Sequence, residues 1–230
     1  MDRDDVTELL EDPSLPVEVV ARAYQALART HRWLGNTSAI IRRLRNSERP
    51  VRSVLDIGCG QGALLCEIRR KLGVEVVGFD LRPAPESVPV RILAGDAVAD
   101  PLPAADVAVS VCLAHHLSEH DIVRLIRNVS RSCRRFILLD LVRHRLPLVL
   151  FRTFLCPFLP GINVADGLTS VRRSYTPAEL KKIVDRAVRG SGARVRHAVA
   201  PCYIRQTVDI DWPASGRQRP GAGEDFPGYR

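Results

Sequence analysis

The sequence predicts an α/β fold in which a mostly parallel sheet is covered by helices on both faces. Short apolar runs that suit strands alternate with segments whose apolar residues recur at helical spacing. The strand-like runs are continuously apolar, which is typical of parallel strands buried on both faces. The last two expected strands are separated by very little chain, so they must be antiparallel neighbours.

The expected elements run from a helical N-terminal region to a final hairpin. Residues 16–44 have helical spacing and divide into two helices at Gly35 and Asn36. Strands are expected at residues 53–57, 74–79, 90–93, 105–111, 135–140, 193–200 and 202–209. Helices are expected at residues 63–72, 119–132 and 177–188. Thr176 is the expected N-cap of the last helix, with Glu179 near the capping-box position.

The chain is expected to form one main domain with a helical cap, an insertion and a tail. Residues 1–50 form the helical N-terminal cap, and residues 51–210 form the main domain. Residues from about 142 to 175 interrupt the strand and helix rhythm with prolines and glycines, which indicates an inserted apolar lid. Residues 211–230 are rich in proline, glycine and charge, and are expected to be a disordered tail.

Composition limits the possible partners and compartments. The 34 Lys and Arg residues exceed the 26 Asp and Glu residues, which gives a net charge of +8. Because the basic residues are spread over the chain, they give little support for nucleic-acid binding. The six cysteines form no Cys-x-x-Cys pair, so we expect no metal site and a reducing compartment. The acidic N-terminus and the lack of an apolar run of about 18–20 residues predict a cytoplasmic protein.

A glycine-rich loop follows the first expected strand and indicates a nucleotide site. The loop contains Gly58, Gly60 and Gly62 between a strand and a helix, an arrangement that lets backbone approach a ligand closely. With Ala63 in the third place, the loop also satisfies the dinucleotide fingerprint of dehydrogenases. Asp56 stands directly before the glycines, where its charge would repel a pyrophosphate and favour a cationic ligand.

Residues 54–62 resemble motif I of the class I S-adenosylmethionine-dependent methyltransferases. Residues 105–117 resemble the fourth strand and following loop in the branch that includes ubiquinone and menaquinone C-methyltransferases. The resemblance covers roughly residues 51–209, and implies a Rossmann-like, seven-stranded sheet and S-adenosylmethionine as the cofactor. It assigns to the cofactor site Asp56, Gly58, Gly60, Gly62, Asp80, Leu81, Asp96, Ala97 and Cys112.

The resemblance also implies individual roles for these residues. Asp80 would hold the ribose hydroxyls, with Leu81 against the adenine ring. Asp96 would accept the adenine amino group, and the backbone N–H of Ala97 would meet a ring nitrogen. The carboxylates have an alternative interpretation, because Asp commonly caps helices and makes turns.

Two adjacent histidines are the candidate general bases. His115 and His116 follow the fourth strand, at the carboxyl edge where doubly wound sheets bind ligands. An imidazole titrates near neutral pH, so either residue can remove a proton from an acceptor. Alternatively, the pair caps the next helix or packs against the adenosine.

The acceptor is expected to be a small, aromatic or lipophilic molecule. Residues 110–113 lack the Asn/Asp-Pro-Pro-aromatic motif of many amino-group methyltransferases, which favours a phenolic, quinonoid or polyketide-like acceptor. We expect O-methylation ahead of C-methylation. The apolar segment Leu146–Ile162 could enclose such a substrate, pack as a core helix, form a dimer face or contact a lipid surface.

The segment from Asp166 to Tyr175 has two further interpretations. Arg172 or Arg173 could hold a phenolate or carboxylate, and Tyr175 could donate a hydrogen bond to a substrate. Equally, these side chains and Asp166 could fasten a loop.

Three other functions are compatible with the sequence. The chain could methylate protein or RNA, for which its positive charge is the only support. It could be a non-catalytic cofactor-binding module that acts with a partner enzyme. A dehydrogenase is the third alternative, and the sequence predicts no particular oligomeric state.

Overall fold

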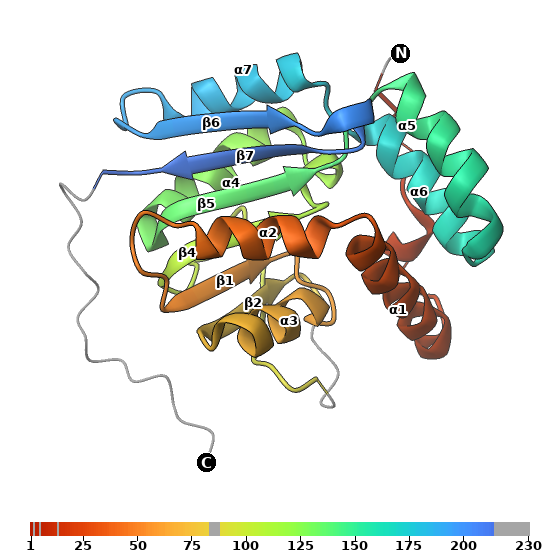
Figure 1. Cartoon of the computed structure of the whole chain (residues 1–230), viewed down its shortest axis with the longest axis horizontal. Helices are drawn as coiled ribbons and strands as arrows, with labels where there is room; N and C mark the ends of the chain where they lie inside the picture. Colours follow the sequence, from red (N-terminus) through yellow and green to blue (C-terminus); the bar gives the residue numbers. More distant parts are fainter. Residues whose placement is uncertain (2, 5, 13, 83–87, 214–230) are drawn as a thin grey trace.

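A seven-stranded sheet forms the centre of the protein (Figure 1). The computed structural model describes residues 1, 3–4, 6–12, 14–82 and 88–213. In spatial order the strands are β3 (Ile92–Ala94), β2 (Glu75–Asp80), β1 (Ser53–Ile57), β4 (Ala105–Val111), β5 (Cys133–Asp140), β7 (Gln206–Asp211) and β6 (Arg194–Val199). The first five strands of the chain pair in parallel, whereas β7 is antiparallel to both β5 and β6. The predicted α/β fold and its antiparallel final hairpin are confirmed.

Helices cover both faces of the sheet. The longer ones are α1 (Val17–Trp33), α2 (Asn36–Arg45), α3 (Ala63–Leu72), α4 (Glu119–Ser132), α5 (Arg145–Leu150), α6 (Gly161–Arg173) and α7 (Pro177–Val188). Short turns are η1 (Leu9–Glu11), η2 (Ala114–His116), η3 (Phe151–Leu155), η4 (Cys156–Phe158) and η5 (Pro201–Tyr203). The predicted capping box of Thr176 and Glu179 at the start of α7 is confirmed. In the described part of the chain, no helix is both long and apolar enough to cross a membrane.

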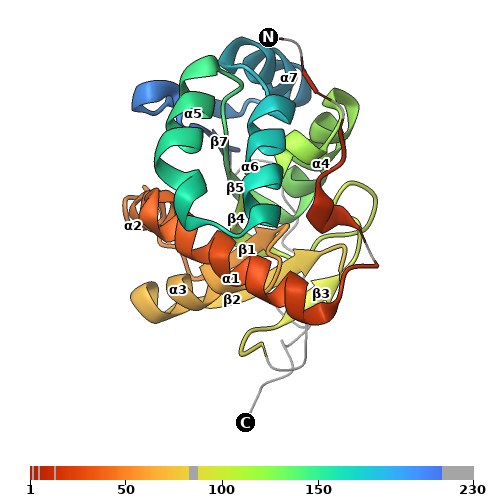
Figure 2. The same cartoon turned by 90° about the vertical axis from the view of Figure 1, so that its right-hand side faces the viewer.

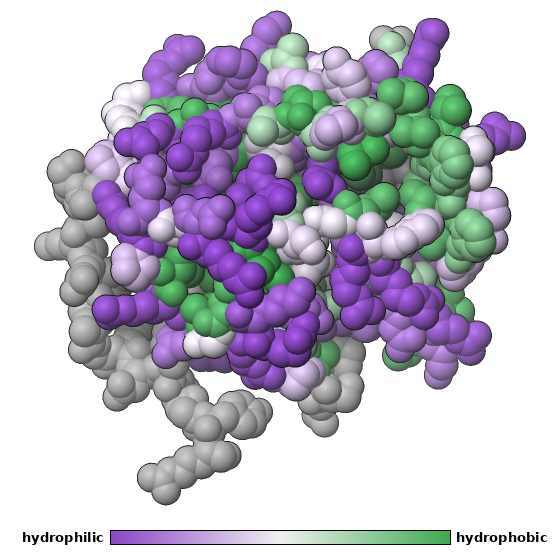
Figure 3. All heavy atoms as spheres, viewed as in Figure 1, coloured by the Kyte–Doolittle hydropathy of each residue, from purple (hydrophilic) through white to green (hydrophobic). Residues whose placement is uncertain are grey.

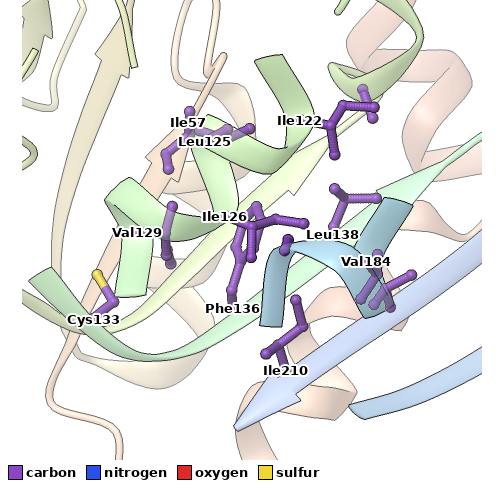
Figure 4. Close-up of a cluster of buried hydrophobic side chains, with 14 of the residues drawn as sticks. Ile57, Ile122, Leu125, Ile126, Val129, Cys133, Phe136, Leu138, Val184 and Ile210 are labelled. Carbon is purple, nitrogen blue, oxygen red and sulfur yellow. The ribbon is translucent and has the colours of Figure 1, made fainter. Parts of the chain in front are cut away.

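Successive residues of the central strands enter two separate cores. Leu55 and Ile57 of β1 pack in a cluster with α4 and α7, together with Phe136 (Figure 4). Val54 packs on the opposite face of the sheet, in a cluster to which α2 and α3 contribute. Side chains of a strand point alternately to the two faces of the sheet, and both faces are buried. Nearly every residue of a central strand is therefore apolar in the sequence.

The strand order creates a crevice at one edge of the sheet. The chain passes from β1 to β2 on one side and returns to β4 on the other side of β1. In doubly wound sheets, ligands bind at such a switch point, beyond the carboxyl ends of the strands. Helices α1, α5 and α6 stand beyond this edge (Figures 1 and 2).

The expected lid, about residues 142–175, is largely helical. Helix α6 includes Gly167, which sequence reasoning takes as a helix breaker. A Cβ atom at Gly167 would collide with the ring of Phe151, so close packing against η3 requires a glycine there.

The last strand of the C-terminal hairpin begins and ends later than predicted. Residues Pro201–Tyr203 form η5, and β7 extends to Asp211 instead of ending at residue 209. Trp212 is buried, with 6% of its surface exposed, and its N–H donates to the carbonyl of Arg134. The expected tail from residue 211 therefore starts at least two residues too early, and its residues 214–230 lie outside the described chain.

Candidate active site

A cavity of about 500 Å³ opens at the carboxyl ends of β1, β2 and β4. Its lining brings together most of the residues that the sequence predicts for the site. These are Asp56, Gly58, Gly60, Asp80, Leu81, Cys112 and His116. Helix α1 and the N-terminal segment supply further walls, including Tyr24 and Glu8. A volume in this range is typical of pockets for small molecules.

The glycine loop adopts a backbone that only glycine takes easily. Gly58, Gly60 and Gly62 have φ values of 72°, 53° and 72°. A Cβ atom on Gly60 would lie 2.7 Å from a ring carbon of Tyr24, so this glycine also lets α1 approach the loop. Helix α3 begins after Gly62 without a side-chain cap, which leaves its N-terminus available to a ligand.

Asp80 joins the second strand to the glycine loop. Its Oδ2 accepts a hydrogen bond of 2.7 Å from the N–H of Gly60, and its Oδ1 accepts one of 3.1 Å from the N–H of Arg82. Because Asp80 lines the cavity, the carboxylate holds the loop and faces the ligand space at the same time.

Asp56 is a buried carboxylate in the same cavity, with only 3% of its surface exposed. Burial raises the pKa of this carboxyl well above its ordinary value, and the nearby charge of Asp80 raises it further. Within the described ranges, no side chain or backbone N–H donates a hydrogen bond to it. A cationic ligand would relieve this unfavourable charge.

Replacing Asp56 by Asn is expected to stabilise the free protein while weakening cofactor binding. Removing an uncompensated buried charge should raise the free energy of unfolding by about 1 kcal/mol, or Tm by roughly 2–4 °C. If Asp56 faces the ammonium group of S-adenosylhomocysteine, as the resemblance implies, the same change should weaken binding of that ligand at least about tenfold, because the ammonium group would lose its counter-charge. Calorimetry and thermal unfolding of the two proteins test this, with the exposed Asp185→Asn as a control. A variant that is less stable than the wild type would contradict it.

His115 is buried beneath the cavity between two carboxylates. Its Nδ1 lies 2.6 Å from Oδ1 of Asp140, and its Nε2 lies 3.4 Å from Oε1 of Glu8. Its backbone N–H also donates to Oδ2 of Asp140, at 2.9 Å. Burial alone would lower the pKa of the imidazole, but Asp140 and Glu8 outweigh burial and raise it to about 9. His115 is therefore a charged link between β5 and the N-terminal segment.

The stability of the protein is expected to fall as pH rises from about 6.5 to about 9. His115 has a folded-state pKa above its unfolded value, so its stabilisation is complete below pH 6.5 and is lost through about pH 9. The difference corresponds to about 3 kcal/mol of unfolding free energy. His31 is half-buried, and desolvation lowers its pKa to about 4, so its titration changes the stability only below pH 6.5. Urea titrations at several pH values measure the slope.

The Asp140→Asn variant provides the comparison for this pH dependence. Without the Asp140 charge, the pKa of His115 should move down, and the loss of stability above pH 6.5 should become shallower. An unchanged slope in Asp140→Asn would show that a different group causes it.

His116 faces the cavity, next to a carboxylate that sequence reasoning misses. Its Nε2 lies 3.9 Å from Oε1 of Glu8, and both residues line the cavity. The hydroxyl of Ser170 donates to the same Glu8 oxygen at 2.6 Å. Burial would raise the pKa of Glu8, but His115 and its other partners outweigh this and lower it. An ionised carboxylate therefore stands beside the His116 imidazole.

Helix α6 holds the N-terminal segment that carries Glu8. The carboxylate of Asp166 accepts hydrogen bonds from the N–H groups of Leu9 and Leu10, at 2.7 and 3.0 Å. Ser170 lies one helical turn further and contacts Glu8. The loop-fastening interpretation of Asp166 therefore agrees with the structure. Tyr175 acts similarly, since its hydroxyl donates to the carbonyl of Leu117 at 2.7 Å.

Glu8, His115 and His116 also form a cluster whose possible metal-ligating atoms all lie within 4.8 Å of one another. Cysteine and histidine spacing gives no sign of this cluster, because Glu8 is far away in the sequence. The imidazole of His115 carries a proton up to about pH 9, which a metal ion would have to displace. The absence of a metal requirement stays a prediction.

Four predicted residues lie outside the cavity lining. Gly62 is the N-terminal neighbour of α3, and His115 is buried below the site. Asp96 uses its Oδ1 to accept a hydrogen bond from the N–H of Val98, and Ala97 packs against the core. The assignment of Gly62, Asp96 and Ala97 to the cofactor, and of His115 to catalysis, stays a prediction.

Cys112 is a predicted cofactor residue that does line the cavity, and its backbone is unusual. Its φ of 56° is rare for a residue other than glycine. Its N–H donates to the carbonyl of Leu139 at 2.9 Å, which holds the residue in place after β4. Such backbone strain is frequent at functional sites.

Residues 54–135 match the family model described as "Methyltransferase domain". The chain is similar to this family over that segment. The matched segment contains the glycine loop, Asp80 and both candidate histidines. Among curated protein sequences, none matches this chain significantly.

Solved methyltransferases share the fold of most of this chain at low sequence identity. The plantazolicin methyltransferase BpumL, in complex with SAH, has a TM-score of 0.66 at 12% identity, over 89% of this chain and 93% of that one. Human N-acetylserotonin methyltransferase, in complex with SAM, has a TM-score of 0.56 at 17% identity, over 88% and 61%. The pyocyanin biosynthetic protein PhzM has a TM-score of 0.56 at 17% identity, over 76% and 54%. The predicted Rossmann-like methyltransferase fold is confirmed.

Proposed function

We propose that this protein transfers a methyl group from S-adenosylmethionine to a hydroxyl oxygen of a small phenolic, quinonoid or polyketide-like acceptor. One observation carries the proposal. The lining of a single cavity includes the glycine loop with the carboxylates of Asp56 and Asp80, and also the Glu8 and His116 pair. The site therefore combines groups suited to the cofactor with a group suited to taking a proton from an acceptor.

The residues present fit S-adenosylmethionine better than a dinucleotide. Asp56 is a buried carboxylate that favours a positive charge, and Asp80 offers acceptor oxygens to ribose hydroxyls. A pyrophosphate at the same loop would meet both negative charges and be repelled. When bound, the cofactor would supply an electrophilic methyl group on a positively charged sulfur.

Proton removal from the acceptor is the chemical contribution that we assign to His116. His116 is the proposed general base, because its ring faces the cavity whereas His115 is buried between two carboxylates. Glu8 lies beside the ring and would stabilise the imidazolium that forms. His115 and Asp140 would position the N-terminal segment and the turn η2.

Several features support a small acceptor. Glu8 and Leu10 of the N-terminal segment and Tyr24 of α1 are part of the wall, so the site is concave instead of a flat face for a macromolecule. Human N-acetylserotonin methyltransferase has the same fold, and its name specifies a small acceptor. The similarity of residues 105–117 to ubiquinone and menaquinone methyltransferases supports a quinonoid or phenolic ring.

Calorimetric titration with S-adenosylhomocysteine and NAD tests the cofactor, and a methylation screen tests the acceptor. We expect saturable binding of S-adenosylhomocysteine and no heat with NAD. The protein and S-adenosylmethionine are then incubated with phenols and quinones, and products are analysed by mass spectrometry with and without EDTA. One added methyl group on oxygen, formed equally in EDTA, is the expected result.

Other outcomes would replace the proposal. Binding of NAD in place of S-adenosylhomocysteine would indicate a dehydrogenase. Methylation of RNA or protein, with no small molecule modified, would change the acceptor class. Cofactor binding without turnover, until a partner enzyme is added, would indicate a non-catalytic module.

A further inference from the structure

An exposed apolar surface lies beside the methyltransferase site, and the proposed reaction does not use it. It consists of Leu146, Val149, Phe154 and Phe158 on α5–η4, together with Trp33 at the end of α1. Phe158 and Trp33 are 77% and 69% exposed. Figure 3 shows a broad hydrophobic area over α5, and Figure 2 shows the segment that follows α5 approaching α1. We call these five residues the α5 surface.

A groove connects the two parts of the α5 surface. It has a volume of about 300 Å³ and is lined by Trp33 and Arg29 of α1 and by Leu155, Phe158 and Leu159 of the opposite segment. Other residues of α1, including Tyr24 and His31, line the methyltransferase cavity. Helix α1 therefore separates the groove from the methyltransferase cavity, and different side chains of α1 line the two.

The charges around the α5 surface are of one sign. Residues 141–165 contain no Asp or Glu, and of their three arginines Arg145 and Arg152 are exposed, whereas Arg143 is buried and pairs with Glu179. Residues 21–33 also contain three arginines and no Asp or Glu. Arg29, Arg145 and Arg152 are exposed, and within the part of the chain that the structure describes none of them forms an ion pair. Exposed aromatic and aliphatic side chains bordered by arginines are typical of proteins that contact anionic lipid surfaces.

We propose that the α5 surface docks on an anionic phospholipid membrane. Phe154, Phe158 and Trp33 would enter the interfacial layer, and the arginines would contact lipid phosphates. A second copy of this chain is a poorer partner, because isologous pairing would bring the same arginines toward one another. Docking would place α1, one wall of the methyltransferase cavity, at the lipid surface.

Vesicle flotation tests the proposal with the full chain. The wild type is expected to float with vesicles of phosphatidylglycerol and phosphatidylcholine, but not with phosphatidylcholine alone. The double variant Phe154→Ser/Phe158→Ser should bind at least about tenfold more weakly, because its apolar anchors are gone. Arg145→Gln/Arg152→Gln should also bind the anionic vesicles more weakly than the wild type does, and added salt should weaken wild-type binding.

Matched control variants distinguish binding through the α5 surface from nonspecific binding to vesicles. Val17→Ser removes an equally exposed apolar side chain at the opposite end of α1, and Arg189→Gln removes an exposed arginine beyond α7. Both should float as the wild type does, and the Phe variant should still bind S-adenosylhomocysteine normally. No flotation of the wild type, or equal flotation of the Phe variant, would overturn the proposal. A wild-type dimer that the Phe variant abolishes would identify a second copy as the partner instead.

Discussion

Replacing Asp80 by Ala is expected to weaken S-adenosylhomocysteine binding at least about 100-fold, as measured by calorimetry. Under the proposed assignment, this carboxylate accepts hydrogen bonds from both ribose hydroxyls. Hydrogen bonds to a charged group contribute about 1.5–3 kcal/mol each, so losing two costs about 3 kcal/mol or more. The change also removes the acceptor of the Gly60 N–H, which lies 2.7 Å from Asp80 Oδ2. The loss of the ribose contacts and the disturbance of the glycine loop both reduce the affinity for S-adenosylhomocysteine.

A modified ligand separates the two consequences. An analogue of S-adenosylhomocysteine without its ribose hydroxyls should bind the wild type weakly, and Asp80→Ala should weaken it further only by the cost of the disturbed loop. If the variant weakens both ligands equally, Asp80 acts on the loop alone and the ribose assignment is wrong. Asp80→Asn, which keeps an acceptor oxygen for Gly60, is the variant to use if Asp80→Ala does not fold. The exposed Asp185→Asn controls for general effects of losing a carboxylate.

Local sequence patterns were sufficient to predict most of the sheet. Buried parallel strands such as β1 and β4 are continuous apolar runs, so their position can be read directly from the sequence. The errors occur where tertiary packing overrides composition. Gly167 lies within a helix because Phe151 packs against it, and Trp212 belongs to the core although its neighbours resemble a tail. Neither contact has a local signal.

Only those parts of the candidate site that follow successive strands of the sheet were predictable from the sequence. The glycine loop and Asp80 occupy fixed places after two successive strands, and the chain order alone brings them to one edge of the sheet. Glu8 was missed because it reaches His115 and His116 only through the docking of the N-terminal segment on α6. Asp166 and Ser170, which hold that segment, are unremarkable polar residues in the sequence.

Replacing His116 by Ala is expected to lower kcat about 100- to 10,000-fold with the acceptor that the methylation screen identifies. The acceptor hydroxyl would lose the group that takes its proton, whereas the Asp56 and Asp80 end of the cavity would be unchanged. The dissociation constant for S-adenosylhomocysteine should therefore stay within about twofold of the wild-type value. His120→Ala, which removes an exposed histidine from α4, should leave both quantities unchanged.

Chemical rescue distinguishes a base from a structural histidine. Added imidazole can occupy the space left in His116→Ala and accept the proton, so it should restore part of the lost rate in proportion to its concentration.

Glu8→Gln should lower kcat less than His116→Ala does, because it removes only the carboxylate 3.9 Å from the ring. The combined variant should be no slower than His116→Ala, since Glu8 is proposed to act through His116. A His116→Ala enzyme that keeps its kcat would show that the acceptor loses its proton without this residue. Loss of activity without any rescue, together with weakened cofactor binding, would instead make His116 a packing residue of the cavity wall.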